Sequence, residues 1–171
     1  MNRLWIAAAA LLTGCATPPQ SYRDEKPELD LMRYFDGRLD ASGMFQDRFG
    51  KVVKRFTVEM DCHWNGTVGT FDEHFTYSDG THERRVWTVT KTADHRYRGT
   101  AADVVGEAAG EAWGNALNWR YTLRLKVGNG SYDMQFDDWM FLIDDKVMLN
   151  RATMSKFGIE LGQVTLSFRK R

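Results

Sequence analysis

Cysteine is scarce in this chain. Its 171 residues contain only Cys15 and Cys62. If Cys15 is consumed by lipidation, Cys62 is left without a partner, which excludes an intramolecular disulfide. Cys62 also continues an alternating apolar pattern, so a buried thiol is favoured over a catalytic one.

Proline is absent from most of the sequence. All three prolines lie between Ala16 and Glu28, at positions 18, 19 and 27. We therefore expect Ala16 to Glu28 to be a flexible tether, followed by a region in which nothing interrupts long strands.

Several function classes lack the residues that they need. Basic and acidic side chains balance at 23 each, which gives no reason to expect a nucleic-acid partner. There is no phosphate-binding glycine loop, and the four histidines fall on separate expected strands, so neither a cofactor nor a metal is expected. No nucleophile, base and orienting group share one face, which makes a hydrolase or lyase the least favoured class.

The only long apolar run is at the start. Leu4 to Leu12 is too short to span a bilayer as a helix, and it follows a basic Met1 to Arg3. Leu12-Thr13-Gly14-Cys15 comes next and resembles the lipobox of bacterial lipoproteins, whereas a buried N-terminal helix would need a polar face that this run lacks. We predict a signal peptide over 1–14, a lipidated N-terminus and tether over 15–28, and one domain over 29–171.

Lipidation at Cys15 would place the protein in the cell envelope. Acyl chains on this cysteine, which palmitate labelling would detect, anchor a protein to a membrane without a transmembrane helix. Ala16, rather than aspartate, follows the cysteine. We therefore expect the periplasmic face of the outer membrane, with the inner membrane as the alternative, and a monomeric protein.

Strand-like runs alternate with turn signals throughout the remaining sequence. This pattern predicts an all-β antiparallel up-and-down meander, which leaves two exposed edges unless it closes into a lipocalin-like (calycin-like) barrel. A two-sheet β-sandwich is the alternative, and a short helical turn is expected around Ser155 to Glu160. The ten expected strands lie near 34–46, 51–63, 67–77, 82–91, 95–102, 104–113, 116–127, 131–143, 146–154 and 162–170.

The stretch from Ser131 to Thr153 contains one residue that breaks the alternation. Asp138 falls where the two-residue period demands an apolar side chain. A two-residue turn at Asp144 and Asp145 would place Asp138 opposite Arg151 on the next strand, so we predict an inward acid and guanidinium pair.

Three other turns predict further cross-strand pairs. A three-residue Ser78-Asp79-Gly80 loop with a glycine bulge places Glu73 opposite Arg85, as a second inward pair. A turn at Asn65-Gly66 places Val58 opposite Glu73, and one at Asn129-Gly130 places Tyr121 opposite Asp138. Tyr121, Asp138 and Arg151 would then form one inward row.

Small residues share one face of the expected strand over 104–113. Its neighbour carries large side chains, including Trp119 and Tyr121. The small residues either let the large rings fill the barrel or leave room for an apolar guest, and both interpretations stay open. The small residues are Gly106, Ala108, Gly110 and Ala112.

Four segments in order resemble the DUF3833 family of bacterial lipoproteins, over residues 29 to 170. They are FDGRLDASGMFQDRFGKVVKRF, DEHFTYSDGTHERRVWT, GNALNWRYTL and FDDWMFLIDDKVMLNRATMSKFGIELGQVTL. The function of the family is unknown, so the resemblance implies a lipoprotein but no catalytic residues.

Two functions remain in favour. The first is an anchored barrel that binds a lipid, fatty acid or other small apolar ligand, with Arg151 or Arg85 available for a carboxylate or phosphate head. The second is a structural or interaction lipoprotein with a filled barrel, whose ion pairs only fix the strand register. The predicted ligand-binding residues are Glu73, Arg85, Tyr121, Asp138 and Arg151.

Overall fold

The computed structural model describes residues 17–171. The predicted signal peptide over 1–14 and the predicted lipidation site Cys15 lie outside these residues. Within 17–171, no helix has the length and apolar character needed to cross a membrane.

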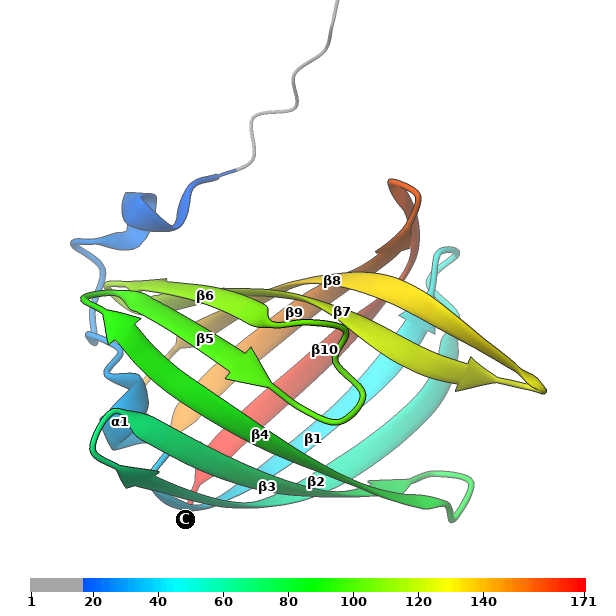
Figure 1. The fold of residues 1–171 in the computed structure, drawn as a ribbon, viewed down its shortest axis with the longest axis horizontal. Helices are drawn as coiled ribbons and strands as arrows, with labels where there is room; N and C mark the ends of the chain where they lie inside the picture. Colours follow the sequence, from blue (N-terminus) through cyan, green and yellow to red (C-terminus); the bar gives the residue numbers. More distant parts are fainter. Residues whose placement is uncertain (1–16) are drawn as a thin grey trace, which may run out of the picture.

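Ten antiparallel strands close into one barrel, in which each strand pairs with its neighbours in sequence and β1 pairs with β10 (Figure 1). This confirms the predicted meander and closure and removes the sandwich alternative. The strands are β1 (Gly37–Asp47), β2 (Val52–Asn65), β3 (Val68–Tyr77), β4 (His82–Ala93), β5 (Arg96–Thr100), β6 (Ala108–Trp113), β7 (Ala116–Val127), β8 (Gly130–Leu142), β9 (Val147–Lys156) and β10 (Ile159–Lys170).

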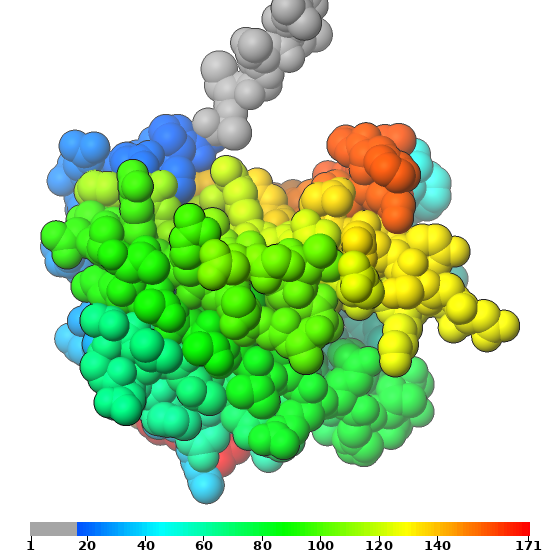
Figure 2. All heavy atoms as spheres, in the orientation of Figure 1, coloured from blue at the N-terminus to red at the C-terminus, as the bar shows by residue number. Residues whose placement is uncertain are grey.

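The turns of a meander alternate between the two ends of the barrel. The β1–β2, β3–β4, β7–β8 and β9–β10 turns therefore share one end, which we call the mouth. The opposite end carries the first helix and the C-terminus (Figure 1). The β1–β2 and β9–β10 hairpins, in cyan and orange, project side by side from the molecular surface at the mouth (Figure 2).

A short helix closes the end opposite the mouth. α1 (Leu31–Tyr34) begins at Asp30, whose carboxylate accepts a hydrogen bond from Met32 N at 2.9 Å. Leu31 is buried, and the Phe35 ring stacks on Phe71 at 5.1 Å between centroids. The strand expected from residue 34 thus begins at Gly37, because the preceding residues form a plug.

The plug is also held by hydrogen bonds. Trp64 Nε1 donates to the Phe35 carbonyl at 2.8 Å, and Tyr34 Oη donates to the Lys146 carbonyl at 3.0 Å. The two hydrogen bonds attach the plug to the end of β2 and to the residue before β9. The plug is therefore a fixed part of the floor of the barrel.

The expected tether is instead packed against the barrel, which corrects that prediction. Residues 19–22 form the 3-10 helix η1 (Pro19–Tyr22), and the Tyr22 ring contacts Trp139 and Phe141 at 5.7 and 5.3 Å between centroids. A Cβ on Gly114 would lie 1.7 Å from the Tyr22 carbonyl oxygen, so glycine permits this approach. The physical reason is that two outward aromatic rings of β8 gain an apolar cover.

The helical turn expected around Ser155 to Glu160 is also wrong. β9 and β10 continue to Lys156 and Ile159, and only Phe157 and Gly158 separate them. Both residues have positive φ, 52° and 75°, which forms a tight hairpin rather than a helix.

Candidate functional site

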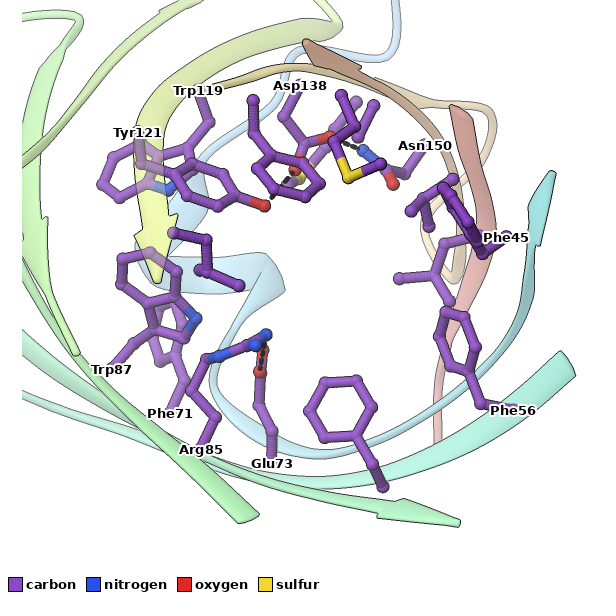
Figure 3. Close-up of a pocket in the computed structure, with 18 of the residues that line it drawn as sticks. Phe45, Phe56, Phe71, Glu73, Arg85, Trp87, Trp119, Tyr121, Asp138 and Asn150 are labelled. Carbon is purple, nitrogen blue, oxygen red and sulfur yellow. Dashed lines mark hydrogen bonds and ion pairs between the residues drawn. The ribbon is translucent and has the colours of Figure 1, made fainter. Parts of the chain in front are cut away.

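The barrel encloses a cavity of about 440 Å³. Its floor is formed by Leu31 and Phe35 of the plug, and its lining extends to Tyr77 and Val127 beside the turns of the mouth. The wall is mostly apolar, with aromatic rings from several strands (Figure 3). A volume of this size is within the range of small-molecule sites in proteins.

One polar group in the wall is built around Arg85. Glu73 on β3 lies opposite Arg85 on β4, as predicted from the glycine-bulge loop, and Gly80 has the positive φ of 81° that this loop requires. The closest Glu73 and Arg85 charged atoms are 3.8 Å apart, and both side chains point into the cavity (Figure 3).

Asp103 is a third member of this group, and no pattern in the sequence predicts it. It lies in the connection between β5 and β6, and Arg85 Nε and Nη2 reach its Oδ2 at 2.9 and 2.8 Å. The strand expected to start at residue 104 begins at Ala108, and residues 101–107 form the loop that positions this carboxylate. Arg85 is therefore already held by two acids.

The pKa values in this group follow from burial. Burial raises the pKa of Glu73 to about 7, against the opposing effect of Arg85. Burial alone would lower the pKa of Arg85, but Glu73 and Asp103 raise it by more, so the guanidinium remains charged.

A second polar group faces the first from β7, β8 and β9. Tyr121 Oη donates to Asp138 Oδ2 at 3.4 Å, and Asn150 Nδ2 donates to Asp138 Oδ1. Asp138 is buried, and no ion pair among residues 17–171 includes it. Burial accordingly raises the pKa of Asp138 to about 7, although both hydrogen bonds lower it.

The predicted pairing of Asp138 with Arg151 is wrong. Asp138 lies opposite Ala152, and Arg151 lies opposite Trp139 with its side chain in solvent, where it donates to Gln163 Oε1 at 3.1 Å. The β8–β9 loop contains three residues, Asp144 to Lys146, and the extra residue moves Arg151 to the outer face.

A side-chain cap explains this loop length. Asp144 Oδ1 accepts hydrogen bonds from the backbone N–H groups of Lys146 and Val147 at 2.8 and 2.7 Å. Ala152 occupies the position directly opposite Asp138, and Asn150, two residues earlier on the same inward face, donates to the Asp138 carboxyl.

The registers of the β2–β3 and β7–β8 pairs each differ from the prediction by two residues. A shift of two residues leaves every side chain on the predicted face of its strand. Met60, not Val58, lies opposite Glu73, and Trp119, not Tyr121, lies opposite Asp138. Tyr121 still reaches Asp138 diagonally through its hydroxyl, so these two members of the predicted row meet without being direct partners.

The small residues of the wall accommodate Trp119. A Cβ on Gly110 would lie 2.2 Å from this ring, and one on Gly99 would lie 2.6 Å from it. At this part of the wall the small residues make room for the Trp119 ring, as the first interpretation expected. The rest of the barrel interior still contains the cavity.

Cys62 is buried beneath the plug, as predicted. It is 1% exposed, and burial raises the pKa of its thiol to about 12, so the thiolate that nucleophilic chemistry requires is disfavoured.

Known structures share this fold at very low sequence identity. An S-type phycobiliprotein lyase, CPES from Guillardia theta, matches with a TM-score of 0.56 and 5% identity over 82% of this chain and 90% of its own. A protein of the DUF3598 family from Nostoc punctiforme matches with a TM-score of 0.53 and 8% identity, over 86% of this chain and 51% of its own. A de novo designed fluorescence-activating β-barrel has a TM-score of 0.46 and 12% identity, over 84% and 99% of the two chains.

Sequence comparison is informative at the family level. No curated protein matches the chain. The family described as a protein of unknown function, DUF3833, matches residues 9–170, which is nearly the whole sequence. The chain therefore belongs to the DUF3833 family.

Proposed function

We propose that the barrel binds a lipid, a fatty acid or another small apolar ligand in its cavity. The observation that carries the proposal is an apolar space of about 440 Å³ with a few convergent polar groups in its wall. We further propose that Cys15 carries the acyl chains of a lipoprotein on the periplasmic face of the outer membrane, with the inner membrane as the alternative. The motif around Cys15 supports this part.

The polar end of the ligand would meet hydrogen-bond acceptors. Among residues 17–171 no basic side chain forms an ion pair with Asp138, and Arg85 is already engaged by Asp103 and Glu73. A carboxylate head would have to compete with Asp103 for the guanidinium, whereas a hydroxyl or an uncharged acid could donate to Asp138 directly. Arg151 is on the outer face and is not part of the proposed site.

The alternative function is a filled structural barrel. The packing of Trp119 over Gly99 and Gly110 favours it locally. The cavity favours ligand binding, because native interiors leave few voids larger than a water molecule.

Native mass spectrometry of the gently purified complete chain tests the proposal. We expect one small-molecule adduct per chain, released on unfolding and identified by its mass. A protein that carries no adduct, and takes up none from a total lipid extract, would support the filled barrel instead.

A further inference from the structure

The most exposed aromatic side chains of the described chain lie together at the mouth. Phe49 is 83% exposed at the tip of the β1–β2 hairpin, and Phe157 is 88% exposed at the tip of the β9–β10 hairpin. These hairpins are neighbours because β1 pairs with β10, down to Asp47 opposite Gly162 (Figure 2). Ile159, 57% exposed, extends the apolar surface.

Basic side chains surround these rings. The Arg48 guanidinium lies 5.1 Å from the centroid of the Phe49 ring, and Lys156 Nζ lies 5.3 Å from that of Phe157. Lys51 follows in the first hairpin, and none of the ion pairs within residues 17–171 uses Arg48, Lys51 or Lys156. Asp47 is occupied in capping its own loop through the Phe49 and Lys51 N–H groups. Asp47 keeps its charge, and the exposed Glu160 follows Ile159, so the two tips carry three basic and two acidic side chains, a net charge of +1.

The backbone at Phe157 adds an independent argument. Its φ of 52° is in the left-handed region, where glycine and asparagine are favoured and bulky residues are uncommon. A phenylalanine here suits neither the turn nor a core, because it is almost wholly exposed. Strain retained at an exposed position points to a role in contact with something outside the protein.

We infer that the tips of these two hairpins dock onto an anionic phospholipid bilayer. The tip surface comprises Phe49, Phe157 and Ile159 with Arg48, Lys51 and Lys156. Aromatic side chains on protruding turns can enter the boundary between headgroups and acyl chains, while lysine and arginine pair with anionic headgroups.

Docking there would bring the cavity close to the bilayer. The cavity lining reaches Val127 and Tyr77 at the same end, beside the tip surface. This inference goes beyond the proposed ligand binding, since the tips can bind a bilayer whether or not the cavity is occupied.

Vesicle cosedimentation tests the inference. Residues 17–171 include every strand and the plug, and a cooperative melt with a near-ultraviolet circular dichroism signal confirms the fold before binding is measured. We expect binding to phosphatidylglycerol-containing vesicles, weaker binding to pure phosphatidylcholine, and a decrease at high salt. F49S with F157N should weaken binding about tenfold or more, and asparagine also suits the backbone at 157.

The matched control removes exposed apolar side chains from the other end. Ile143 is 51% exposed and Val68 is 41% exposed at turns opposite the mouth, and I143S with V68S should leave vesicle binding unchanged. The inference would be overturned if the two double variants lost vesicle binding equally, or if the folded wild type did not bind anionic vesicles. The exposed tips would then be explained by a protein partner.

A second measurement uses the complete chain. Brominated lipids in anionic vesicles should quench added tryptophan fluorescence in F49W but not in I143W. Equal quenching at both positions would also overturn the inference.

Discussion

Asn150 donates a hydrogen bond to Asp138 from the neighbouring strand, inside the barrel. The residue next to it, Arg151, points into solvent on the other side of the wall. The acid that interrupts the apolar face is thus matched by a neutral amide and by the Tyr121 hydroxyl, not by a cation. Within residues 17–171, this relationship leaves a buried carboxyl without a neutralising charge on this side of the cavity.

Stability should decrease as pH rises through neutrality. The pKa of Asp138 is about 7 in the folded chain against an ordinary 3.8, so the folded state holds a proton that the unfolded state has lost between these values. The stabilising contribution is complete below about pH 4 and is lost by about pH 8. A rise from 3.8 to about 7 corresponds to about 4 kcal/mol, and Glu73 acts in the same direction.

The D138N variant should flatten this pH profile. Thermal melts of the wild type and D138N between about pH 5 and pH 9 make the comparison, with outward-facing D61N as the control. At the alkaline end D138N should melt at least as high as the wild type, because it has no charge to desolvate. A wild type that gains stability above pH 7 would contradict the raised pKa.

Removal of the Arg151 charge should have little effect. Arg151 is exposed and lies outside the cavity, so R151M should change the free energy of unfolding by no more than about 0.5 kcal/mol. Asn150 is buried against Asp138, and N150L should cost about 1 to 3 kcal/mol because it leaves Asp138 Oδ1 without its donor, although Tyr121 still donates to Oδ2. Urea unfolding of both variants measures this, and a large loss in R151M alone would show that Arg151 acts inside the barrel.

The contact of Gly110 with Trp119 should not tolerate a methyl group. A Cβ at this glycine would lie 2.2 Å from the ring, so G110A should destabilise the fold by about 1 to 3 kcal/mol. A109V adds volume on the exposed face of the same strand and serves as the control. If G110A has the same melting temperature as the wild type, the Trp119 ring can move aside for a methyl group, and the prediction is wrong.

The predicted anchor can be tested separately from the barrel. Because the Cys15 thiol is the only attachment point for a diacylglyceryl group, C15A should abolish incorporation of labelled palmitate. C62A, which alters the other cysteine, should label normally. Undiminished labelling of C15A would refute the lipoprotein assignment while leaving the cavity proposal in place.

Loop length determined which parts of the site the sequence could predict. Gly80 can adopt the positive φ that a three-residue loop with a bulge requires, so the loop length was recognisable from the sequence. The predicted pairing of Glu73 with Arg85 is confirmed. The Asp144 loop is also three residues long but contains no glycine, and its cap is visible only in the hydrogen bonds of the Asp144 side chain. This one additional loop residue turns Arg151 to the outer face and places Asn150 and Ala152 inside the barrel.

Contacts between distant segments could not be predicted from local patterns. Asp103 meets Arg85 because the β5–β6 connection hydrogen-bonds along β7, where Arg124 N donates to the Asp103 carbonyl. Tyr22 packs against Trp139 although proline and polar residues surround it in sequence. The number of strands and their closure were predictable, since alternation and turn signals recur throughout residues 34–170.

The central claim is that an apolar ligand occupies the cavity, and a cavity-filling variant tests it most directly. Ala152 is buried opposite Asp138 and lines the cavity, so A152F should fill space that a ligand needs, whereas R151F adds the same ring on the outer face. A fluorescent long-chain fatty acid is titrated into each folded variant, and a long-chain alcohol is used to displace it. We predict saturable one-to-one binding to the wild type and to R151F, displacement by the alcohol, and loss of binding in A152F. Equal binding by a folded A152F, or no saturable binding by the wild type, would contradict the account.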